Sequence, residues 1–156
     1  MLLLKRLEPL TRPLFHARAR WTRGLTLGVR GLVRDGQGRV LLLHHTYTSG
    51  WHMPGGGVEL GETTEQALAR EMVEEAGVEL IGRPVLRSFH CTGASFRGDH
   101  ILFFEVRDWR AVPATSRGEI HAVEWFAPDA LPNETTRGAR ARIAETLTGA
   151  EPDVMW

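Results

Sequence analysis

One segment, residues 56–78, restricts the fold more than any other part of the chain, because it carries the local signals of a helix with defined ends. Thr63 is a good N-cap, and Gln66 three residues later completes a capping-box pattern. Gly77 stands where a left-handed C-terminal cap belongs. The apolar residues between these signals recur with helical spacing: Ala69, Met72, Val73 and Ala76. The sequence therefore predicts a helix from about Thr64 to Ala76, with this stripe in the core.

Three glutamates share one face of this predicted helix. Glu71, Glu74 and Glu75 are spaced i, i+3 and i+4, so their carboxylates project together. They lie toward the C-terminal end, where the helix dipole favours a cation. A segment that follows the other local rules and breaks this one is a candidate functional site. A hard divalent cation such as Mg²⁺ or Mn²⁺, which takes oxygen ligands, would relieve the repulsion.

A glycine run, Pro54-Gly55-Gly56-Gly57, precedes the helix. Glycines let the backbone approach a ligand closely, so the carbonyl of Gly55 is available to complete a coordination shell. Each part also has an ordinary interpretation. A glycine run is more often a turn than a ligand cradle, and a glutamate cluster is usually a solvated helix face. The residues taken singly leave these alternatives open.

The whole segment resembles the signature of the Nudix hydrolases, G-x5-E-x7-R-E-U-x-E-E-x-G-U, in which U is an aliphatic residue. Every constrained position agrees: Gly56, Glu62, Arg70, Glu71, Met72, Glu74, Glu75, Gly77 and Val78. The stretch from Trp51 to Gly56 resembles the lead-in that is usual in the family. Glu119 resembles the further glutamate that many members place on a loop near the site. The motif match spans residues 56–78 of 156.

The resemblance implies a hydrolase that cleaves a pyrophosphate bond in a nucleoside diphosphate linked to another group, with water attacking phosphorus. It implies a metal site for Mg²⁺ or Mn²⁺ built from Gly55 (carbonyl), Glu71, Glu74, Glu75 and Glu119. Arg70 would pair with Glu62 and orient the loop. The base that activates water would be Glu119 or Glu71, because family members differ on this point.

Substrate choice depends on residues outside the signature. The candidates for substrate contacts are Arg30, His45, Trp51 and Asn133, followed by His44, Phe89 and Phe96. Each residue type is more often core or surface than contact. The tyrosine or proline typical of the subgroups for dinucleoside polyphosphates and ADP-ribose is missing near Ala94, and the extra motif of the coenzyme A subgroup is missing too. A nucleoside triphosphate or a sugar nucleotide stays open.

Charge distribution adds a second functional interpretation. Net charge is zero, so there is no general signal for nucleic acid and we expect no stable nucleic-acid partner. Residues 1–39, however, hold nine Lys or Arg and two acidic residues. A solvated basic segment explains this best, but an RNA 5′-end pyrophosphohydrolase would use it on the RNA backbone. The third interpretation is a non-catalytic nucleotide-sensing Nudix module.

The length of 156 residues suits a single domain. We expect a basic N-terminal arm or helix at residues 1–22, one Nudix hydrolase domain at residues 23–150 and a tail at residues 151–156. Trp156 in the tail would dock on the body or on a second subunit, which makes a homodimer possible. The three-leucine run near the start is too short for a signal peptide or a membrane span, so we expect a cytoplasmic protein.

Hydrophobic runs predict the remaining elements. Strands are expected at Leu25–Val33, Val40–Leu43, Val78–Cys91, His100–Val106 and Ile120–Phe126, and a second helix at Asn133–Leu147. Ala141, Ala144 and Leu147 would pack that helix on the core, and Cys91 would be a buried structural thiol. The order of elements predicts an α/β fold, a Nudix-type α/β/α sandwich with a mixed sheet and helices on both faces.

Overall fold

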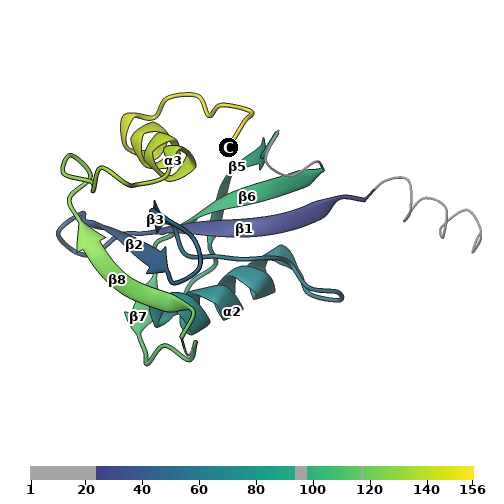
Figure 1. Ribbon diagram of the computed structural model, residues 1–156, viewed down its shortest axis with the longest axis horizontal. Coiled ribbons are helices and arrows are strands. Elements are labelled where there is room, and N and C mark those ends of the chain that lie inside the picture. The colour runs from purple at the N-terminus through teal and green to yellow at the C-terminus, as the bar shows by residue number, and fades with distance from the viewer. Residues whose placement is uncertain (1–23, 94–97, 117) are drawn as a thin grey trace, which may run out of the picture.

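The computed structural model describes residues 24–93, 98–116 and 118–156. The predicted N-terminal arm and Phe96 lie outside these ranges. In Figure 1 the sheets form the middle of the molecule, helix α3 (Arg137–Thr148) lies on one side, and helix α2 (Thr64–Ala76) lies on the other. The predicted sandwich with helices on both faces is confirmed.

The main sheet is mixed. Strand β1 (Thr26–Val33) runs parallel to β6 (Asp99–Val106), in register from Thr26 opposite Asp99 to Val33 opposite Val106. Strand β5 (Val85–Cys91) runs antiparallel to β6, with an irregularity between Leu86 and Ser88. The order is β1-β6-β5. A parallel pair needs a long crossover connection, and the chain between β1 and β6, which includes α2, supplies it.

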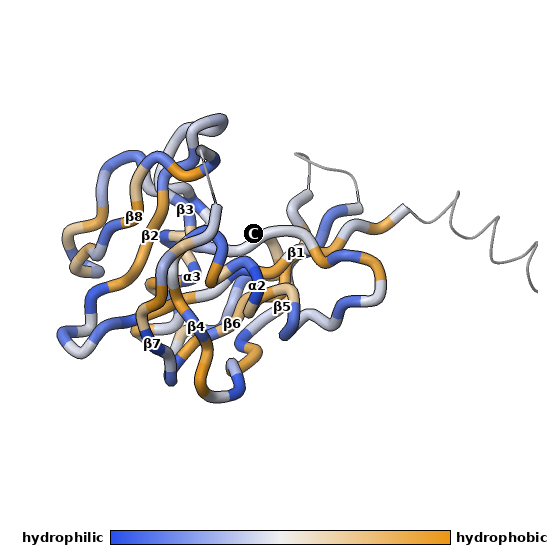
Figure 2. Tube along the Cα trace, turned by 90° about the horizontal axis from the view of Figure 1, so that it is seen from below, coloured by the Kyte–Doolittle hydropathy of each residue, from blue (hydrophilic) through white to orange (hydrophobic). Residues whose placement is uncertain are grey.

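Two smaller sheets flank this one. Strand β2 (Val40–His45) lies between β3 (Trp51–His52) and β8 (Ile120–Phe126), antiparallel to both. Strand β4 (Val78–Leu80) pairs antiparallel with β7 (Trp109–Ala111). The aliphatic start of β2, orange in Figure 2, is buried over all four residues, Val40 to Leu43. The predicted strand is present here, and the unbroken burial shows that it is covered on both faces.

Alternation along β1 divides the core between the two helices. Val29 and Val33 pack with Leu68 and Met72 of α2 in one cluster. Leu32, which points to the opposite face, packs with Ile143 of α3 in the other. Gly31 lies on the α2 face, where a Cβ would lie 2.0 Å from the methyl carbon of Met72, so the helix packs closely on the strand here. The strand period of two therefore assigns each helix its own face of the sheet.

The predicted stripe of α2 is partly wrong. The buried residues are Ala67, Leu68, Met72 and Glu75, whereas Ala69, Val73 and Ala76 are half-buried. Leu68, rather than Val73, is buried in the core, and its side chain and that of Met72 pack against Gly31. The helix is thus turned so that Glu75 points inward.

Two predicted elements have different limits in the structure. The expected strand Val78–Cys91 is two strands in different sheets, because Ile81 and Gly82 donate to the carbonyl of Asp108 instead of continuing a ladder. The second helix begins at Arg137 rather than Asn133. Thr136 donates its N–H to the carbonyl of Trp51, and this bond holds the preceding residues beside β3.

Helix α3 packs through a face that the sequence did not predict. Gly138, Ala139, Arg142 and Ile143 are buried, Ala141 is half-buried, and Ala144 and Leu147 are exposed. Arg142 tolerates burial because its guanidinium contacts His90, the carbonyl of Met155 and Glu145. Polar partners thus compensate for a charge on the buried face of α3.

The C-terminal tail docks on the body of the protein. Cys91, half-buried at the end of β5, donates to the carbonyl of Val154, and Trp156 donates back to the carbonyl of Cys91. The indole of Trp156 lies against Gly138, where a Cβ would come within 2.3 Å of its nitrogen. These contacts cover the end of β5 and fix the tail beside α3.

Candidate active site

The glycine run lies along the edge of β1 that β6 leaves free. Val29 donates to the carbonyl of Gly56 over 2.9 Å, and Gly31 donates to the carbonyl of Pro54 over 3.0 Å. Gly55 has a φ of 136°, and a Cβ there would lie 2.2 Å from the carbonyl oxygen of Val29. Only glycine fits this backbone so close to the strand. The loop is therefore held in place by the central sheet.

Helix α2 begins and ends where its local signals predict. The Thr63 hydroxyl accepts from the N–H of Gln66, and the Gln66 side chain accepts from the N–H of Thr63. Gly77 is left-handed, with φ 62° and ψ 37°, and donates to the carbonyls of Met72 and Val73. This fixed frame brings the last turn of α2, with its glutamates, beside the glycine run.

Glu75 is a buried carboxylate with few partners. Its exposed fraction is 7%, and its Oε2 accepts a hydrogen bond of 2.9 Å from the N–H of Gly55. Burial raises the pKa of Glu75 to about 7, helped by the negative charges of Glu71 and Glu119, while the Gly55 bond and Arg30 act in the opposite direction. The three carboxylates are therefore close enough to repel one another.

Glu71 lies on the neighbouring glycine. A Cβ on Gly56 would be 2.2 Å from Oε1 of Glu71, so this carboxylate occupies the space that the missing side chain leaves. The pair of glycines thus serves two glutamates: Gly55 binds Glu75 and Gly56 makes room for Glu71.

Arg70 connects the carboxylates to the loop. Its guanidinium binds Glu62 at 3.0 Å, Glu71 at 2.7 Å and the carbonyl of Gly57 at 3.1 Å, and Glu74 lies at 3.4 Å. The pairing of Arg70 with Glu62 that the resemblance implies is present. The hydrogen bond from Arg70 keeps the pKa of Glu62 below its ordinary value, and the same bond raises the pKa of Arg70.

Glu74 and Glu119 lie at the open side of the site. They line a pocket of 260 Å³ together with Thr115 and Ser116, which sequence reasoning did not identify. Glu119 is exposed, and its carbonyl accepts from the N–H of Thr46, which fixes the backbone just before β8. Because Glu119 lies in a loop, no periodic sequence pattern predicts that Glu74, Thr115 and Ser116 line the same pocket.

The donor set suits a hard divalent cation, because it consists of carboxylate and carbonyl oxygens around one loop. Within the described ranges, no three His, Cys, Asp or Glu side chains are arranged so that they could hold a metal ion. Two of the glutamates, Glu71 and Glu74, are turned toward Arg70. Arg70 therefore supplies the positive charge that balances these carboxylates, and the metal site stays a prediction.

Two of the predicted substrate residues lie beside Glu75. Arg30 is half-buried on β1, and burial lowers the pKa of its guanidinium against the charges of Glu75 and Glu71. His45 is buried at the end of β2, with its Nδ1 3.9 Å from Oε1 of Glu75. Burial, and then the positive charges of His52 and Arg30, lower the pKa of His45 to about 4, so the ring is neutral at neutral pH.

The other two predicted substrate residues lie at the loop that precedes α3. Trp51 is half-buried, packs edge-on against Phe126 at 4.8 Å, and donates its N–H to the carbonyl of Glu134. Asn133 is exposed in this loop. Phe89 lies apart from both, exposed on β5 and stacked on His100 at 5.2 Å.

Tyr47 is a candidate that no sequence motif includes. Its ring lies 4.9 Å from that of His45, and its side chain is largely exposed. Partial burial raises the pKa of Tyr47, and the charges of Glu75 and Glu119 add to this shift. Tyr47 therefore lies within electrostatic reach of the carboxylates, although no motif includes it.

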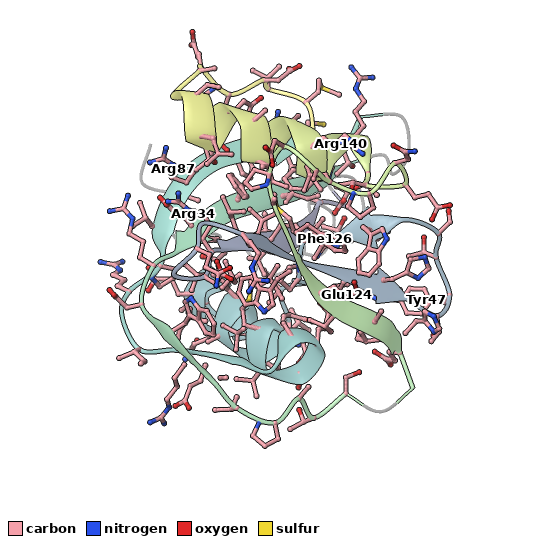
Figure 3. The ribbon with its side chains drawn as sticks, turned by 90° about the vertical axis from the view of Figure 1, so that its left-hand side faces the viewer. Arg34, Tyr47, Arg87, Glu124, Phe126 and Arg140 are labelled. Carbon is pink, nitrogen blue, oxygen red and sulfur yellow. The ribbon has the colours of Figure 1, made fainter. Side chains whose placement is uncertain are left out.

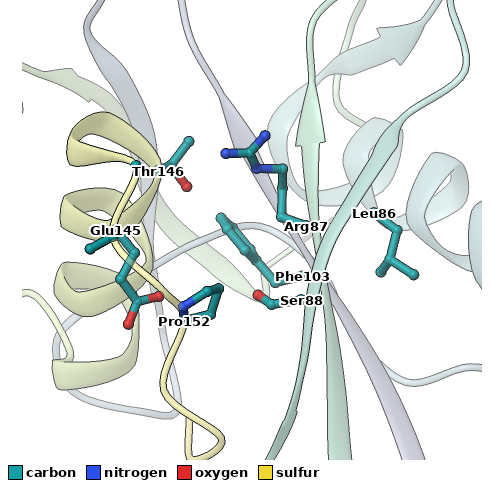
Figure 4. A pocket seen from close by; sticks show the side chains of 9 residues that line it. Leu86, Arg87, Ser88, Phe103, Glu145, Thr146 and Pro152 are labelled. Atoms are coloured by element: carbon teal, nitrogen blue, oxygen red, sulfur yellow. The ribbon is translucent and has the colours of Figure 1, made fainter.

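A separate hollow lies between β5, α3 and the tail (Figure 4). Its volume is 190 Å³, and it is lined by Leu86, Arg87, Ser88, Phe103, Glu145, Thr146, Gly149, Ala150 and Pro152. It shares no residue with the glycine run or with α2. The carboxylate site is therefore the better candidate for the chemistry.

A complete Nudix signature on a glycine loop and a capped helix defines a class of hydrolase. The NUDIX domain model matches residues 24–147, which is more than half of the chain. The chain therefore belongs to the Nudix family, and it is a pyrophosphohydrolase that acts on acid anhydrides. Members of this family generally use divalent metal ions.

Three related proteins are similar in sequence over most of this chain. A MutT-like protein of Streptomyces ambofaciens is 32% identical over 129 residues, which are 83% of this chain and 81% of that protein. A Mycobacterium tuberculosis protein, provisionally named 8-oxo-dGTP diphosphatase 2, is 36% identical over 67% of this chain and 75% of its own length. The NAD-capped RNA hydrolase NudC of Vibrio vulnificus is 34% identical over 78% of this chain and 46% of its own length.

Solved structures agree with the family. The MutT NUDIX hydrolase of Burkholderia pseudomallei is 26% identical, with a TM-score of 0.66 over 76% of this chain and 95% of that one. The E. coli ORF135 protein is 27% identical, with a TM-score of 0.62 over 80% and 89%. The predicted Nudix-type fold is confirmed. No helix in the described part of the chain has the length and apolar content needed to cross a bilayer.

Proposed function

We propose that this protein is a divalent-metal-dependent hydrolase of nucleoside diphosphates linked to a further group, with nucleoside triphosphates as the first substrate class to test. One observation carries the proposal: adjacent glycines of one loop serve two glutamates of one helix, Gly55 by its N–H to Glu75 and Gly56 by the space that it leaves to Glu71. The arrangement holds Glu75 buried beside the charge of Glu71, which weakens a fold unless a ligand uses the carboxylates.

Glu71, Glu74, Glu75 and the carbonyl of Gly55 would hold the ion, Mg²⁺ or Mn²⁺, with Glu119 as a further ligand. When bound, the ion would neutralise charge on the phosphoryl oxygens and acidify a bound water. Arg70 would release Glu71 and Glu74 for this purpose while its bonds to Glu62 and Gly57 keep the loop in place.

The reaction needs a base for water. In the proposed step a water oxygen bonds to phosphorus, the bridging phosphorus–oxygen bond breaks, and a carboxylate takes the proton from the water. Glu119 is exposed and can reach solvent, which favours it as the base. Glu71 is the alternative, but it is held by Arg70 at 2.7 Å. Exchange of each for glutamine separates the two, because loss of the base flattens the pH dependence of turnover.

Arg30 is suited to the phosphate chain. Among the residues that the structure describes, its guanidinium donates one hydrogen bond, to the carbonyl of Val29, and it lies in the field of Glu75 and Glu71. Trp51 and Asn133 would contact the nucleobase of the substrate, since they lie together at the loop that precedes α3. If these residues contact the substrate, substituting any of them should raise KM more than it lowers kcat.

The names of the relatives select the panel of substrates. One relative is provisionally an 8-oxo-dGTP diphosphatase, and another hydrolyses NAD-capped RNA by name. The panel is dGTP, 8-oxo-dGTP, ADP-ribose, a UDP-sugar, NAD-capped RNA and RNA with a 5′-triphosphate, each with Mg²⁺ or Mn²⁺. Release of phosphate, pyrophosphate and nucleoside or RNA 5′-monophosphates is measured, because ADP-ribose, a UDP-sugar and an NAD cap yield neither phosphate nor pyrophosphate.

We expect a nucleoside triphosphate to yield pyrophosphate and a monophosphate only when metal is present. Preference for the RNA, together with binding that weakens steeply with salt, would instead support the RNA 5′-end function. A folded sample that releases nothing from any compound would refute hydrolysis and leave the nucleotide-sensing module.

A further inference from the structure

His45 is a buried side chain near the site with an unmet hydrogen bond. Its exposed fraction is 6%, and its Nδ1 has no hydrogen-bond partner in the described part of the chain. A buried ring nitrogen without a partner destabilises the folded protein. Such a group in a native fold calls for an explanation, and its surroundings supply one.

The backbone of β2 directs His45 toward α2. The pairing of β2 with β8 shifts register between His44 and His45, where β8 has one residue more than β2. Irregularities of this kind are frequent next to active sites. The His45 ring is then held by Tyr47, at 4.9 Å, and by the edge of His52, at 5.4 Å between ring centroids.

The unpartnered nitrogen of His45 faces the buried carboxylate of Glu75. Nδ1 of His45 is 3.9 Å from Oε1 of Glu75, while Oε2 of Glu75 accepts from Gly55. A hydrogen bond needs an approach of about 1 Å, since such bonds are about 2.9 Å long. The inference requires that one of the two side chains turns toward the other by this amount. The two oxygens of Glu75 would then have one fixed donor each.

Direct contact between His45 and a substrate fits the structure less well. The ring is enclosed by Tyr47, His52 and Glu75, and it exposes almost no surface. A substrate would reach the more exposed Tyr47 first. His45 is therefore better suited to act on Glu75 than on the nucleotide.

We propose that His45 is a positioning residue, whose Nδ1–H donates to Oε1 of Glu75 and fixes this carboxylate for a divalent ion. The inference rests on the proposed function, because it assumes that Glu75 is a metal ligand. Groups that orient a ligand from behind commonly change metal affinity by about 10–100-fold when they are removed.

The test uses two variants of almost equal shape, His45→Asn and His45→Leu. Asparagine places an amide N–H close to the position of Nδ1, and leucine places a methyl group there. Both variants lose the ring contacts, so the loss of packing is matched. Binding of Mn²⁺ without nucleotide is measured by titration calorimetry, and a melting curve is recorded for each protein.

We expect His45→Leu to weaken Mn²⁺ binding by about 10-fold or more, and His45→Asn to recover most of that loss, with similar melting temperatures for the two. Equal Mn²⁺ affinity in the two variants would overturn the inference. So would unchanged Mn²⁺ affinity in His45→Leu with a raised KM for nucleotide, which would make His45 a substrate contact.

The unaltered protein separates this inference from the function on which it rests. If it binds Mn²⁺ and hydrolyses a nucleotide while His45→Leu binds Mn²⁺ equally well, only the positioning role fails. If the unaltered folded protein binds no Mn²⁺, the metal-dependent function fails and the positioning role fails with it.

Discussion

Two glutamates of this protein are buried to nearly the same extent and are treated in opposite ways. Glu75 of α2 is 7% exposed and Glu105 of β6 is 3% exposed. Burial alone raises the pKa of any carboxyl group. The pKa of Glu75 rises to about 7, whereas that of Glu105 falls below its ordinary value. The two carboxylates have different neighbours: arginines surround Glu105, whereas acidic side chains lie near Glu75.

Glu105 is surrounded by arginines. Arg34 lies at 2.6 Å, Arg107 at 3.0 Å and Arg87 at 3.8 Å. Figure 3 shows Arg34 and Arg87 close together at one side of the molecule. Burial pushes the pKa of Glu105 up, and the hydrogen bonds and charges of Arg107 and Arg34 together outweigh it. The charge is thus stabilised within the fold itself.

Glu75 has a backbone N–H and little else. The negative charge of Glu71 repels it, and the hydrogen bonds of Arg70 go to Glu71 and Glu62 instead of Glu75. A buried carboxylate left this poorly neutralised is a cost to the folded protein. Glu105 therefore contributes to the stability of the fold, whereas the charge of Glu75 is available to bind a cation.

The largest effect is expected from Glu75→Gln. Glutamine keeps the shape and an oxygen to accept from Gly55, but it removes the charge that would bind the ion. We expect pyrophosphate release to fall on the order of 10³-fold, equivalent to about 4 kcal/mol, without loss of the fold. Turnover with Mg²⁺ and a melting curve are measured, with Glu79→Gln as the control, because Glu79 forms an exposed pair with Arg110. Turnover at the rate of the unaltered protein would show that Glu75 has no part in the chemistry.

Glu105→Gln should show the opposite pattern. It leaves Arg34, Arg87 and Arg107 facing one another, so we expect the free energy of unfolding to fall by about 3 kcal/mol. Mn²⁺ affinity should stay the same, because none of these residues belongs to the carboxylate site. Urea unfolding and Mn²⁺ titration provide the two measurements. A variant that keeps its stability but loses Mn²⁺ binding would reverse the roles that we assign to the two glutamates.

A third difference between the two carboxylates is their effect on stability as pH changes. The pKa of Glu75 is about 7 in the folded protein and ordinary, near 4.5, in the unfolded chain. Between these values the folded state keeps a proton that the unfolded state has lost. Stability from Glu75 is therefore full below about pH 4.5 and is lost as the pH rises to about 7.

The measurement is the free energy of unfolding in EDTA, for the unaltered protein and for Glu75→Gln, from pH 4.5 to pH 7.5. We expect the unaltered protein to lose about 2 kcal/mol relative to the variant over this range. His45, whose lowered pKa acts in the opposite direction, is present in both proteins. A constant difference across the range would mean that Glu75 is ionised and satisfied without metal.

The sequence predicted the elements whose causes are local. The limits of α2 follow from Thr63, Gln66 and Gly77, three residues that act on their own neighbours, and the structure agrees with both ends. The aliphatic run from Val40 to Leu43 likewise carries its own signal of burial. The start of α3 failed as a prediction, because the bond from Thr136 to the carbonyl of Trp51 joins segments far apart in the chain.

The candidate site divides in the same way. The motif placed the glutamates on a helix after a glycine loop, since that order lies within one segment. The proximity of His45, Tyr47 and Glu119 to this helix depends on how β2 and β8 pair and could not be inferred from residue spacing. The separate roles of Gly55 and Gly56 also needed the structure.

The smallest expected effect tests the space at Gly56. Gly56→Ala would place a Cβ within 2.2 Å of Oε1 of Glu71, so the carboxylate must move, whereas the neighbouring Gly57 has open space where a Cβ would be added. Gly57→Ala is therefore a matched control one residue away. We expect Gly56→Ala to weaken Mn²⁺ binding and to slow turnover by about 10-fold, and Gly57→Ala to change both by less than about 2-fold. Equal effects of the two exchanges would mean that the loop needs glycine for its backbone alone, and that the position of Glu71 does not depend on the missing side chain.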